Sequence, residues 1–237
     1  MDIKKLTKNF GVEITNFDCS KIVNNNELEV LNKTIQESHF ICFKNQDLNG
    51  NTLAKFTKNF GDLEAYPEKD KTKGKIEIFN VSNVSEDGKH LSPDDQRVIL
   101  QKNNSRWHTD SSYWYHPASF SILFGQETLP QEAIGGQTEF SNMLIAYDNL
   151  TEEKKTLLQP LHQVHSYNDI RRLEPGLPEL THEEKSNFPP VIHPIIRVHP
   201  DRNFKKSLYF TSNTSLEIGG MSLEKGKKLH AWLVDYI

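Results

Sequence analysis

The apolar residues of this sequence lie in short runs, none of which approaches the length of a membrane span. Several runs alternate apolar with polar residues, which is typical of half-buried strands, and turn residues separate them. We expect strands at 40–43, 76–84, 119–127, 137–140, 191–199 and 207–211. A largely β chain of 237 residues can bury one sizeable core, so the sequence predicts a single domain, 1–237.

Helical signals flank the expected strands. Asn26 and Glu29 can cap a helix that runs to about residue 39, and Asn49 can open another that stops at Gly61. Thr181 and Glu184 form a further capping pair. Short helices are also expected at 142–150 and 151–158, after Ser92, and in an amphipathic segment that contains Leu229, Trp232, Leu233 and Tyr236.

The charge pattern narrows the class of partner. The net charge is -4 and Lys and Glu are interspersed, so the sequence has no strongly basic face for nucleic acid or a membrane surface. A small neutral or anionic substrate is expected instead, and a homo-oligomer is compatible with this composition. The first ten residues lack the apolar region of a signal peptide, so we expect a cytoplasmic protein. Neither Cys19 nor Cys42 has the surroundings of a catalytic thiol.

The segment Trp107-His108-Thr109-Asp110 carries the strongest chemical signal. If it is a strand, His108 and Asp110 point to the same side and can present an imidazole nitrogen and a carboxylate oxygen to one ion. Two histidines and one carboxylate on one face of an octahedron suit non-haem iron(II) and leave three positions open. The pair alone is a weak signal, because a histidine bonded to a nearby aspartate is common.

A second motif, Gly135-Gly136-Gln137-Thr138, follows the first. Glycines allow close backbone approach to a ligand, and the Thr138 hydroxyl could bond a carboxylate. The simpler reading is a turn or bulge before a strand in which threonine is only a good strand former. The polar stretch 85–106 is expected to be a mobile loop leading into the site.

Several motifs in one order give the sequence its resemblance to a known family. They include Trp-His-Thr-Asp at 107–110, Gly-Gly-Gln-Thr-Glu-Phe at 135–140 and His-Pro-Ile-Ile-Arg-Val-His-Pro at 193–200. Further matching segments lie at 10–14, 43–48, 60–64, 81–84 and 146–147. Over nearly its whole length the chain resembles the taurine/2,4-dichlorophenoxyacetate (TauD/TfdA-like) 2-oxoglutarate-dependent dioxygenases.

The resemblance implies a fold, a metal and a reaction. The fold would be mainly β with flanking helices, a double-stranded β-helix or jelly roll. His108 and Asp110 would ligate Fe(II), and Thr138 would help to hold 2-oxoglutarate. The reaction would use O2, decarboxylate 2-oxoglutarate to succinate and hydroxylate a small organic acid.

The sequence departs from the family pattern at its end. The family's third ligand, a histidine, and an arginine that pairs with 2-oxoglutarate have no counterpart here, and the histidine is expected roughly 25 residues beyond Ile237. We therefore expect a domain that is incomplete at its C-terminus and lacks its last strands, with exposed sheet edges. His193 and His199 satisfy the spacing loosely, but the resemblance makes their strand a separate structural feature.

Substrate choice leaves alternatives open. Tyr66 stands where taurine-specific relatives have a histidine, and the run Asp110 to Tyr113 looks closer to the aryloxyalkanoate-type members. Tyr66, Asn83, Asn103 and Asn104 could bond a carboxylate or sulfonate, although asparagine in an exposed loop is usually turn chemistry. A catalytically inactive member that binds a ligand or partner is one alternative. A metal-dependent hydrolase that uses His108, Asp110 and His199 is another.

Overall fold

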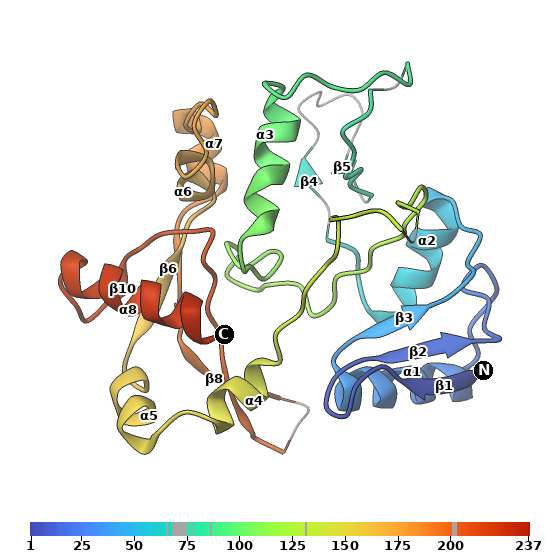
Figure 1. Cartoon of the computed structure of the whole chain (residues 1–237), viewed down its shortest axis with the longest axis horizontal. Coiled ribbons are helices and arrows are strands. Elements are labelled where there is room, and N and C mark those ends of the chain that lie inside the picture. The colour runs from blue at the N-terminus through green and yellow to red at the C-terminus, as the bar shows by residue number, and fades with distance from the viewer. Residues whose placement is uncertain (65, 68–74, 77, 86, 131, 201–202) are drawn as a thin grey trace. The chain divides into compact units, whose positions relative to one another are not determined.

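The structure is a computed structural model that describes residues 1–64, 66–67, 75–76, 78–85, 87–130, 132–200 and 203–237. The chain forms two compact units, each with its own core (Figure 1). Unit 1 comprises Met1–Phe79 and Phe120–Asn142, and unit 2 comprises Asn80–Ser119 and Met143–Ile237. The assignment of the whole chain to one domain stays a prediction.

A three-stranded sheet and one helix open unit 1. Strand β1 (Asp2–Lys5) pairs antiparallel with β2 (Val12–Thr15), which pairs parallel with β3 (Ile41–Phe43). Parallel neighbours need a crossover, and α1 (Asn25–Ser38) supplies it. The expected strand at 40–43 is thus confirmed, whereas the sequence analysis missed β1 and β2.

Capping residues fix where the helices of unit 1 begin. Helix α1 begins after Asn24, which forms a capping box with Glu27, so the helix is confirmed but its cap lies two residues before the predicted Asn26. The helix α2 (Gly50–Thr57) follows Asn49 as predicted and continues as the 3-10 turn η1 (Lys58–Phe60). The buried hydrophobic core of this unit consists of Val12, Ile14, Cys19, Leu31 and Phe56.

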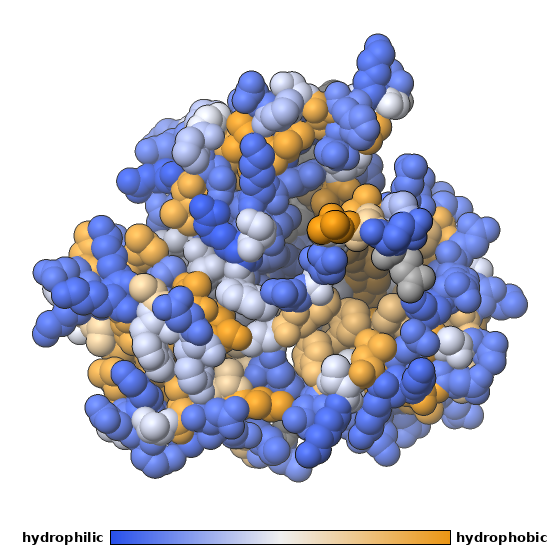
Figure 2. Space-filling view, in the orientation of Figure 1, coloured by the Kyte–Doolittle hydropathy of each residue, from blue (hydrophilic) through white to orange (hydrophobic). Residues whose placement is uncertain are grey.

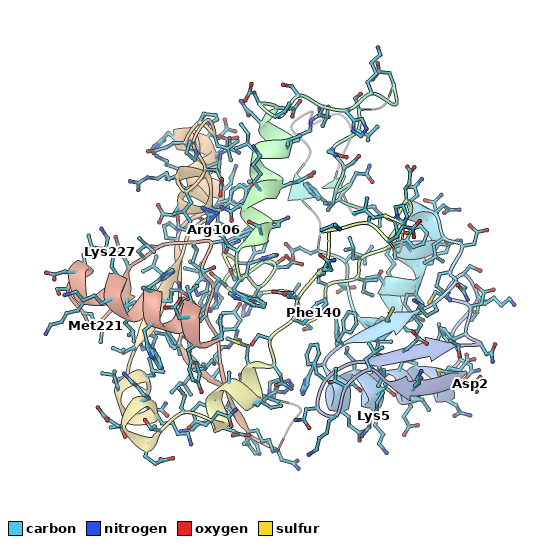
Figure 3. All side chains as sticks on the ribbon, in the orientation of Figure 1. Asp2, Lys5, Arg106, Phe140, Met221 and Lys227 are labelled. Carbon is cyan, nitrogen blue, oxygen red and sulfur yellow. The ribbon has the colours of Figure 1, made fainter. Side chains whose placement is uncertain are left out.

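The expected strands at 119–127 and 137–140 are wrong, because no strand is assigned between Phe120 and the end of unit 1 in the part of the chain that the structure describes. A strand needs a neighbouring strand to pair with, and no strand pairing is assigned to the described residues of these segments. Phe140 (Figure 3) instead packs its ring 4.4 Å from that of Phe40. Of 76–84, only Ile76 is in a strand, β5 (Lys75–Ile76), paired with β4 (Tyr66–Pro67), and residue 77 lies outside the described residues.

Unit 2 contains a second three-stranded sheet and a hairpin. The sheet order is β10 (Ile218–Gly219), β6 (His162–His165), β7 (Val191–Pro194), and the hairpin joins β8 (Ile196–Val198) to β9 (Lys206–Leu208). The strand expected at 191–199 is confirmed with a break at Ile195, and that at 207–211 is confirmed over its first two residues. The sequence analysis missed β6.

The helices of unit 2 include each one that was expected. They are α3 (Gln96–Lys102) with η2 (Asn103–Ser105), α4 (Met143–Asp148), α5 (Glu152–Leu158), α6 (Tyr167–Arg172), α7 (His182–Asn187) and α8 (Leu223–Tyr236). Thr181 and Glu184 form the predicted capping box of α7. Helix α3 lies inside the stretch 85–106 that was expected to be a loop, and Asp95 rather than Ser92 caps it. Helix α6 was missed.

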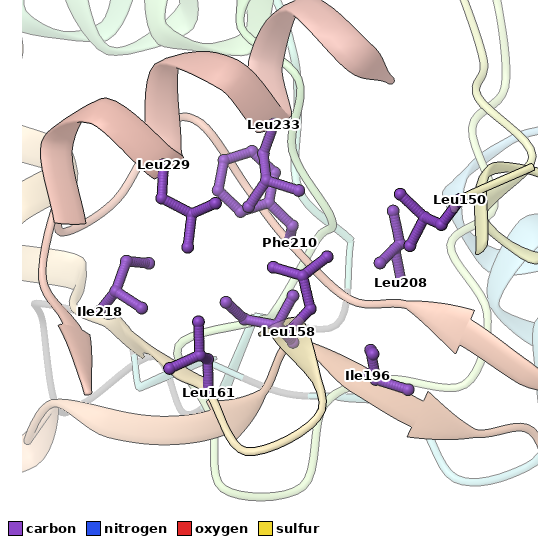
Figure 4. Packing of buried hydrophobic residues seen from close by; sticks show 10 residues of the cluster. Leu150, Leu158, Leu161, Ile196, Leu208, Phe210, Ile218, Leu229 and Leu233 are labelled. Atoms are coloured by element: carbon purple, nitrogen blue, oxygen red, sulfur yellow. The ribbon is translucent and has the colours of Figure 1, made fainter. Parts of the chain in front are cut away.

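One hydrophobic cluster holds unit 2 together (Figure 4). Leu229 and Leu233 of α8 point toward Leu158, Leu208 and other buried apolar side chains. Full burial of a leucine stabilises the folded state by about 1.5–3 kcal/mol, so the buried side chains of this cluster contribute strongly to the stability of the unit. The predicted apolar face of α8 is confirmed, since Trp232 and Tyr236 also pack against the cluster.

Hydrophilic side chains dominate the visible face (Figure 2). Among the helices that the structure describes, none has the length and apolar character needed to cross a membrane. The described strands form two three-stranded and two two-stranded sheets, and the closed jelly roll stays a prediction.

Candidate metal centre

His108 and Asp110 lie close together in unit 2. Nε2 of His108 is 3.5 Å from Oδ1 of Asp110, and the two side chains are 27% and 57% exposed. The expectation that a strand holds them is wrong, because residues 107–109 are irregular and a turn begins at Asp110. The turn brings the imidazole and the carboxylate together on the same side nevertheless.

The His108 ring has a defined orientation. Nδ1 lies 2.7 Å from the carbonyl oxygen of Arg106, which can only accept, so Nδ1 carries the proton. In the neutral ring Nε2 then keeps its lone pair on the side of Asp110, as a metal-binding histidine requires. In the protonated ring Nε2 donates to Asp110 instead, and this hydrogen bond, followed by the bond to the Arg106 carbonyl oxygen, raises the pKa of His108 against the opposing effect of burial.

The pair fits two positions of an octahedral iron site. Donor atoms about 2.1 Å from a metal and at right angles lie about 3.0 Å apart. The observed 3.5 Å is therefore close to the separation of two adjacent ligands. One nitrogen and one carboxylate oxygen also match the ligand types of non-haem iron(II). No group of three or more His, Cys, Asp or Glu side chains able to hold a metal occurs among the described residues.

Bonds from distant residues anchor the segment that contains this pair. The carbonyl oxygen of Trp107 accepts from the backbone nitrogen of Ser212 at 2.7 Å and from its hydroxyl at 3.0 Å. Arg106 (Figure 3) donates from Nη1 to Glu174, 2.7 Å away. The imidazole of His193 lies within bonding distance of the carbonyl oxygens of Ser112 and Trp114. Ser212 and Glu174 were not found from the sequence, because bonds to backbone carbonyls and pairings between distant side chains leave no local sequence signal.

The two histidines of the 193–200 motif do not complete the metal site. His193 directs Nε2 at backbone carbonyls, as a structural residue does. The backbone nitrogen of His199 bonds the carbonyl oxygen of Lys205 across the β8–β9 hairpin. His108, Asp110 and His199 do not form a metal-binding group in the described part of the chain, so the geometry offers the hydrolase alternative no support.

Thr138 and Tyr66 belong to unit 1. Thr138 is exposed in an irregular segment, after Gly135 and Gly136, whose φ angles of 94° and 76° favour glycine. These angles are compatible with a turn or bulge at the two glycines, but no strand follows, and the role of Thr138 in holding 2-oxoglutarate stays a prediction. The Tyr66 backbone pairs with Ile76, and its side chain lies outside the described residues.

Asn83 and Asn103 belong to unit 2 and differ in burial. Asn83 is exposed, and its carbonyl oxygen accepts from the backbone nitrogen of Leu91 at 2.7 Å. Asn103 is only 1% exposed, and its Nδ2 donates to Ile170 and Glu174. The expectation of an exposed loop is therefore wrong at Asn103, because these bonds draw the amide into the interior.

Comparison with known proteins decides the family. Residues 2–237 match the family described as taurine catabolism dioxygenase TauD, TfdA family. The chain belongs to this family.

Two similar relatives are named α-ketoglutarate-dependent 2,4-dichlorophenoxyacetate dioxygenase. This chain is 31% identical to the enzyme of that name from Burkholderia sp. (strain RASC), and the match covers 89% of this chain and 70% of the relative. It is 28% identical to the enzyme of that name from Cupriavidus pinatubonensis, and the match covers 96% of this chain and 78% of that relative. The crystal structure of AAD-2 in complex with Mn(II) and N-oxalylglycine superposes with a TM-score of 0.81 at 29% identity, covering 99% of this chain and 81% of that one. The fold is therefore shared with dioxygenases of this family.

Proposed function

We propose that this protein is an Fe(II)- and 2-oxoglutarate-dependent dioxygenase that hydroxylates a small organic acid. The observation that carries the proposal is the approach of His108 Nε2 to Asp110 Oδ1, 3.5 Å apart, with Nδ1 fixed by the Arg106 carbonyl oxygen. Family membership and the likeness to a protein crystallised with Mn(II) and N-oxalylglycine support it. The double-stranded β-helix belongs to the same proposal.

Each proposed residue has one role. His108 and Asp110 supply a neutral nitrogen and an anionic oxygen to the metal. Thr138 donates its hydroxyl hydrogen to a carboxylate of 2-oxoglutarate. When bound, iron supplies the oxidative chemistry that uses O2, decarboxylates 2-oxoglutarate to succinate and hydroxylates the substrate. The third ligand and the arginine that the resemblance implies stay predictions.

The substrate class is an aryloxyalkanoate-like or sulfonate-like acid. The names of the two relatives favour an aryloxyalkanoate. Tyr66 and Asn83 are the candidate contacts for the acid group. Asn103 has its amide nitrogen engaged, so only its Oδ1 atom, which has no hydrogen-bond partner among the described residues, could contribute. The comparisons give no support to a catalytically inactive binding protein.

Anaerobic titration with Fe(II) and 2-oxoglutarate tests the proposal. We expect a visible charge-transfer absorbance in the unmodified protein, and loss of that absorbance in His108→Ala and Asp110→Asn. His116→Ala removes an exposed histidine outside the pair and is the matched control. An unchanged absorbance in His108→Ala would show that the metal binds elsewhere.

A further inference from the structure

We infer that His193 is a positioning residue for the proposed metal centre, because its imidazole ties the turn that contains Asp110 to strand β7. The inference rests on the proposed function, since the position of Asp110 matters for chemistry only if this carboxylate binds the metal. His193 itself contacts neither Asp110 nor His108 in any described bond, so its effect on the site is indirect.

The His193 imidazole makes a bifurcated hydrogen bond. Nε2 lies 3.0 Å from the carbonyl oxygen of Ser112 and 3.1 Å from that of Trp114. Both partners can only accept, so Nε2 carries the hydrogen and donates to both. Burial lowers the pKa of His193, which favours the neutral ring.

The ring is held where it can make these bonds. His193 is 6% exposed and lies in the middle of β7, opposite Gln163 of β6. The rings of His165 and Tyr209 pack at centroid distances of 5.0 and 5.3 Å. A side chain fixed by a sheet and by two rings loses little further freedom on bonding, so it is a rigid anchor.

The turn needs such an anchor. It begins at Asp110 and continues through Ser111, whose φ of 59° is unfavourable for a residue other than glycine. Its internal bonds run from Ser112 N to the Thr109 oxygen at 3.3 Å and from Trp114 N to the Ser111 oxygen at 3.0 Å. Two bonds from His193 hold this conformation against relaxation to an extended one.

The two proposed ligands are anchored separately. Ser212 holds the carbonyl oxygen of Trp107, directly before His108, through two hydrogen bonds. His193 holds the segment directly after Asp110. Loss of the His193 bonds should therefore loosen the backbone after Asp110, while the segment before His108 keeps its bonds to Ser212.

Hydrogen exchange tests the anchoring without any metal. The peptide that contains residues 107–115 is followed by mass spectrometry in the unmodified protein, His193→Leu, His193→Gln and Leu158→Ala. Glutamine places an amide nitrogen near the position of Nε2, whereas leucine has no donor. Leu158 is fully buried in the core of the same unit, so its alanine variant controls for lost stability.

We expect exchange of this peptide to be about tenfold faster in His193→Leu, and to be restored in His193→Gln. Leu158→Ala should not speed exchange there selectively. If His193→Leu changes the peptide no more than Leu158→Ala does, the inference is overturned.

Mn(II) titration, followed by electron paramagnetic resonance, tests the consequence for the metal. Loss of a partner that orients a metal ligand typically weakens binding by about 10–100-fold, and we expect this for His193→Leu but not for His193→Gln or Leu158→Ala. Equal Mn(II) affinity in His193→Leu and the unmodified protein would overturn the positioning role. If His108→Ala also leaves the affinity unchanged, the proposed function fails instead, and the exchange result still decides whether His193 holds the turn.

Discussion

The guanidinium of Arg106 lies 2.7 Å from the carboxylate of Glu174, which is 68 residues further along the chain. Glu174 also accepts from the amide of Asn103 at 3.2 Å, and its side chain is 10% exposed. Because the Arg106 carbonyl oxygen orients His108, this ion pair connects Glu174, two residues after the end of α6, to the candidate metal centre.

Removing the Glu174 carboxylate should destabilise unit 2. Glu174→Ala leaves the Arg106 guanidinium and the Asn103 amide without their shared acceptor, which should lower the free energy of unfolding by about 1–3 kcal/mol. Urea unfolding measures the change. Glu153→Ala, which alters an exposed carboxylate of α5, should change stability by less than about 0.5 kcal/mol, and equal losses in the two variants would contradict this account.

The C-terminal helix should be sensitive to the loss of one buried leucine. Leu233 has 0% exposure, so Leu233→Ala should lower the free energy of unfolding by about 2–5 kcal/mol through lost burial and a cavity. Leu223, at the start of the same helix, is 55% exposed and provides the control. Thermal unfolding of both alanine variants checks the expectation, and a small loss at Leu233 would show that α8 is not packed as described.

The end of α1 offers a test of backbone strain. His39 caps the helix with φ at 65°, a conformation that favours glycine. His39→Gly should therefore be more stable than His39→Ala by about 1 kcal/mol, because both variants lose the imidazole and only alanine keeps the strain. Denaturant unfolding compares the two, and equal stability would argue against a left-handed cap.

Acid should destabilise the protein through His165. This residue has 0% exposure, and burial, with a smaller effect of His193 and Arg197, lowers its pKa to about 3. Histidine in the unfolded chain keeps its ordinary pKa of about 6.5. Between about pH 6.5 and about pH 3, His165 therefore binds a proton in the unfolded chain but not in the folded protein. The contribution of neutral His165 to the free energy of unfolding is complete above about pH 6.5, and it falls by about 1.4 kcal/mol per pH unit below that pH.

The variant His165→Phe isolates this effect. It should remove the His165 part of the decline, so the stability lost between about pH 7 and about pH 5 should shrink by about 2 kcal/mol. Neither ring nitrogen of His165 has a hydrogen-bond partner among the described residues, so phenylalanine leaves no described bond broken. Urea unfolding at the two pH values gives the comparison, and identical declines would rule out His165 as the source.

Local signals made the helices predictable. Asn49 and Thr181 cap α2 and α7 through side chains three residues away, so a short stretch of sequence contains the whole interaction. At α1 the run Asn24 to Asn26 offers more than one capping register, and the expected cap was two residues too late. The strands at 119–127 and 137–140 were wrong because pairing depends on a distant neighbour, which alternation does not specify.

The candidate metal centre also contains residues that could be predicted from the sequence and residues that could not. His108 and Asp110 are two positions apart, so their proximity could be predicted although the predicted strand is a turn. The residues that hold them could not, since His193 and Ser212 bond backbone carbonyls 79 to 105 positions away. A carbonyl oxygen is present in every residue, so only the folded chain reveals which ones are bound.

The parallel pairing of β2 with β3 has a consequence for the order of folding. Only the segment with α1 separates the two strands, so bringing them together closes a short loop at a small cost in chain entropy. All five buried residues of this core lie within the first 56 positions. We therefore expect this part of unit 1 to form early during synthesis on the ribosome, before most of unit 2 has been translated.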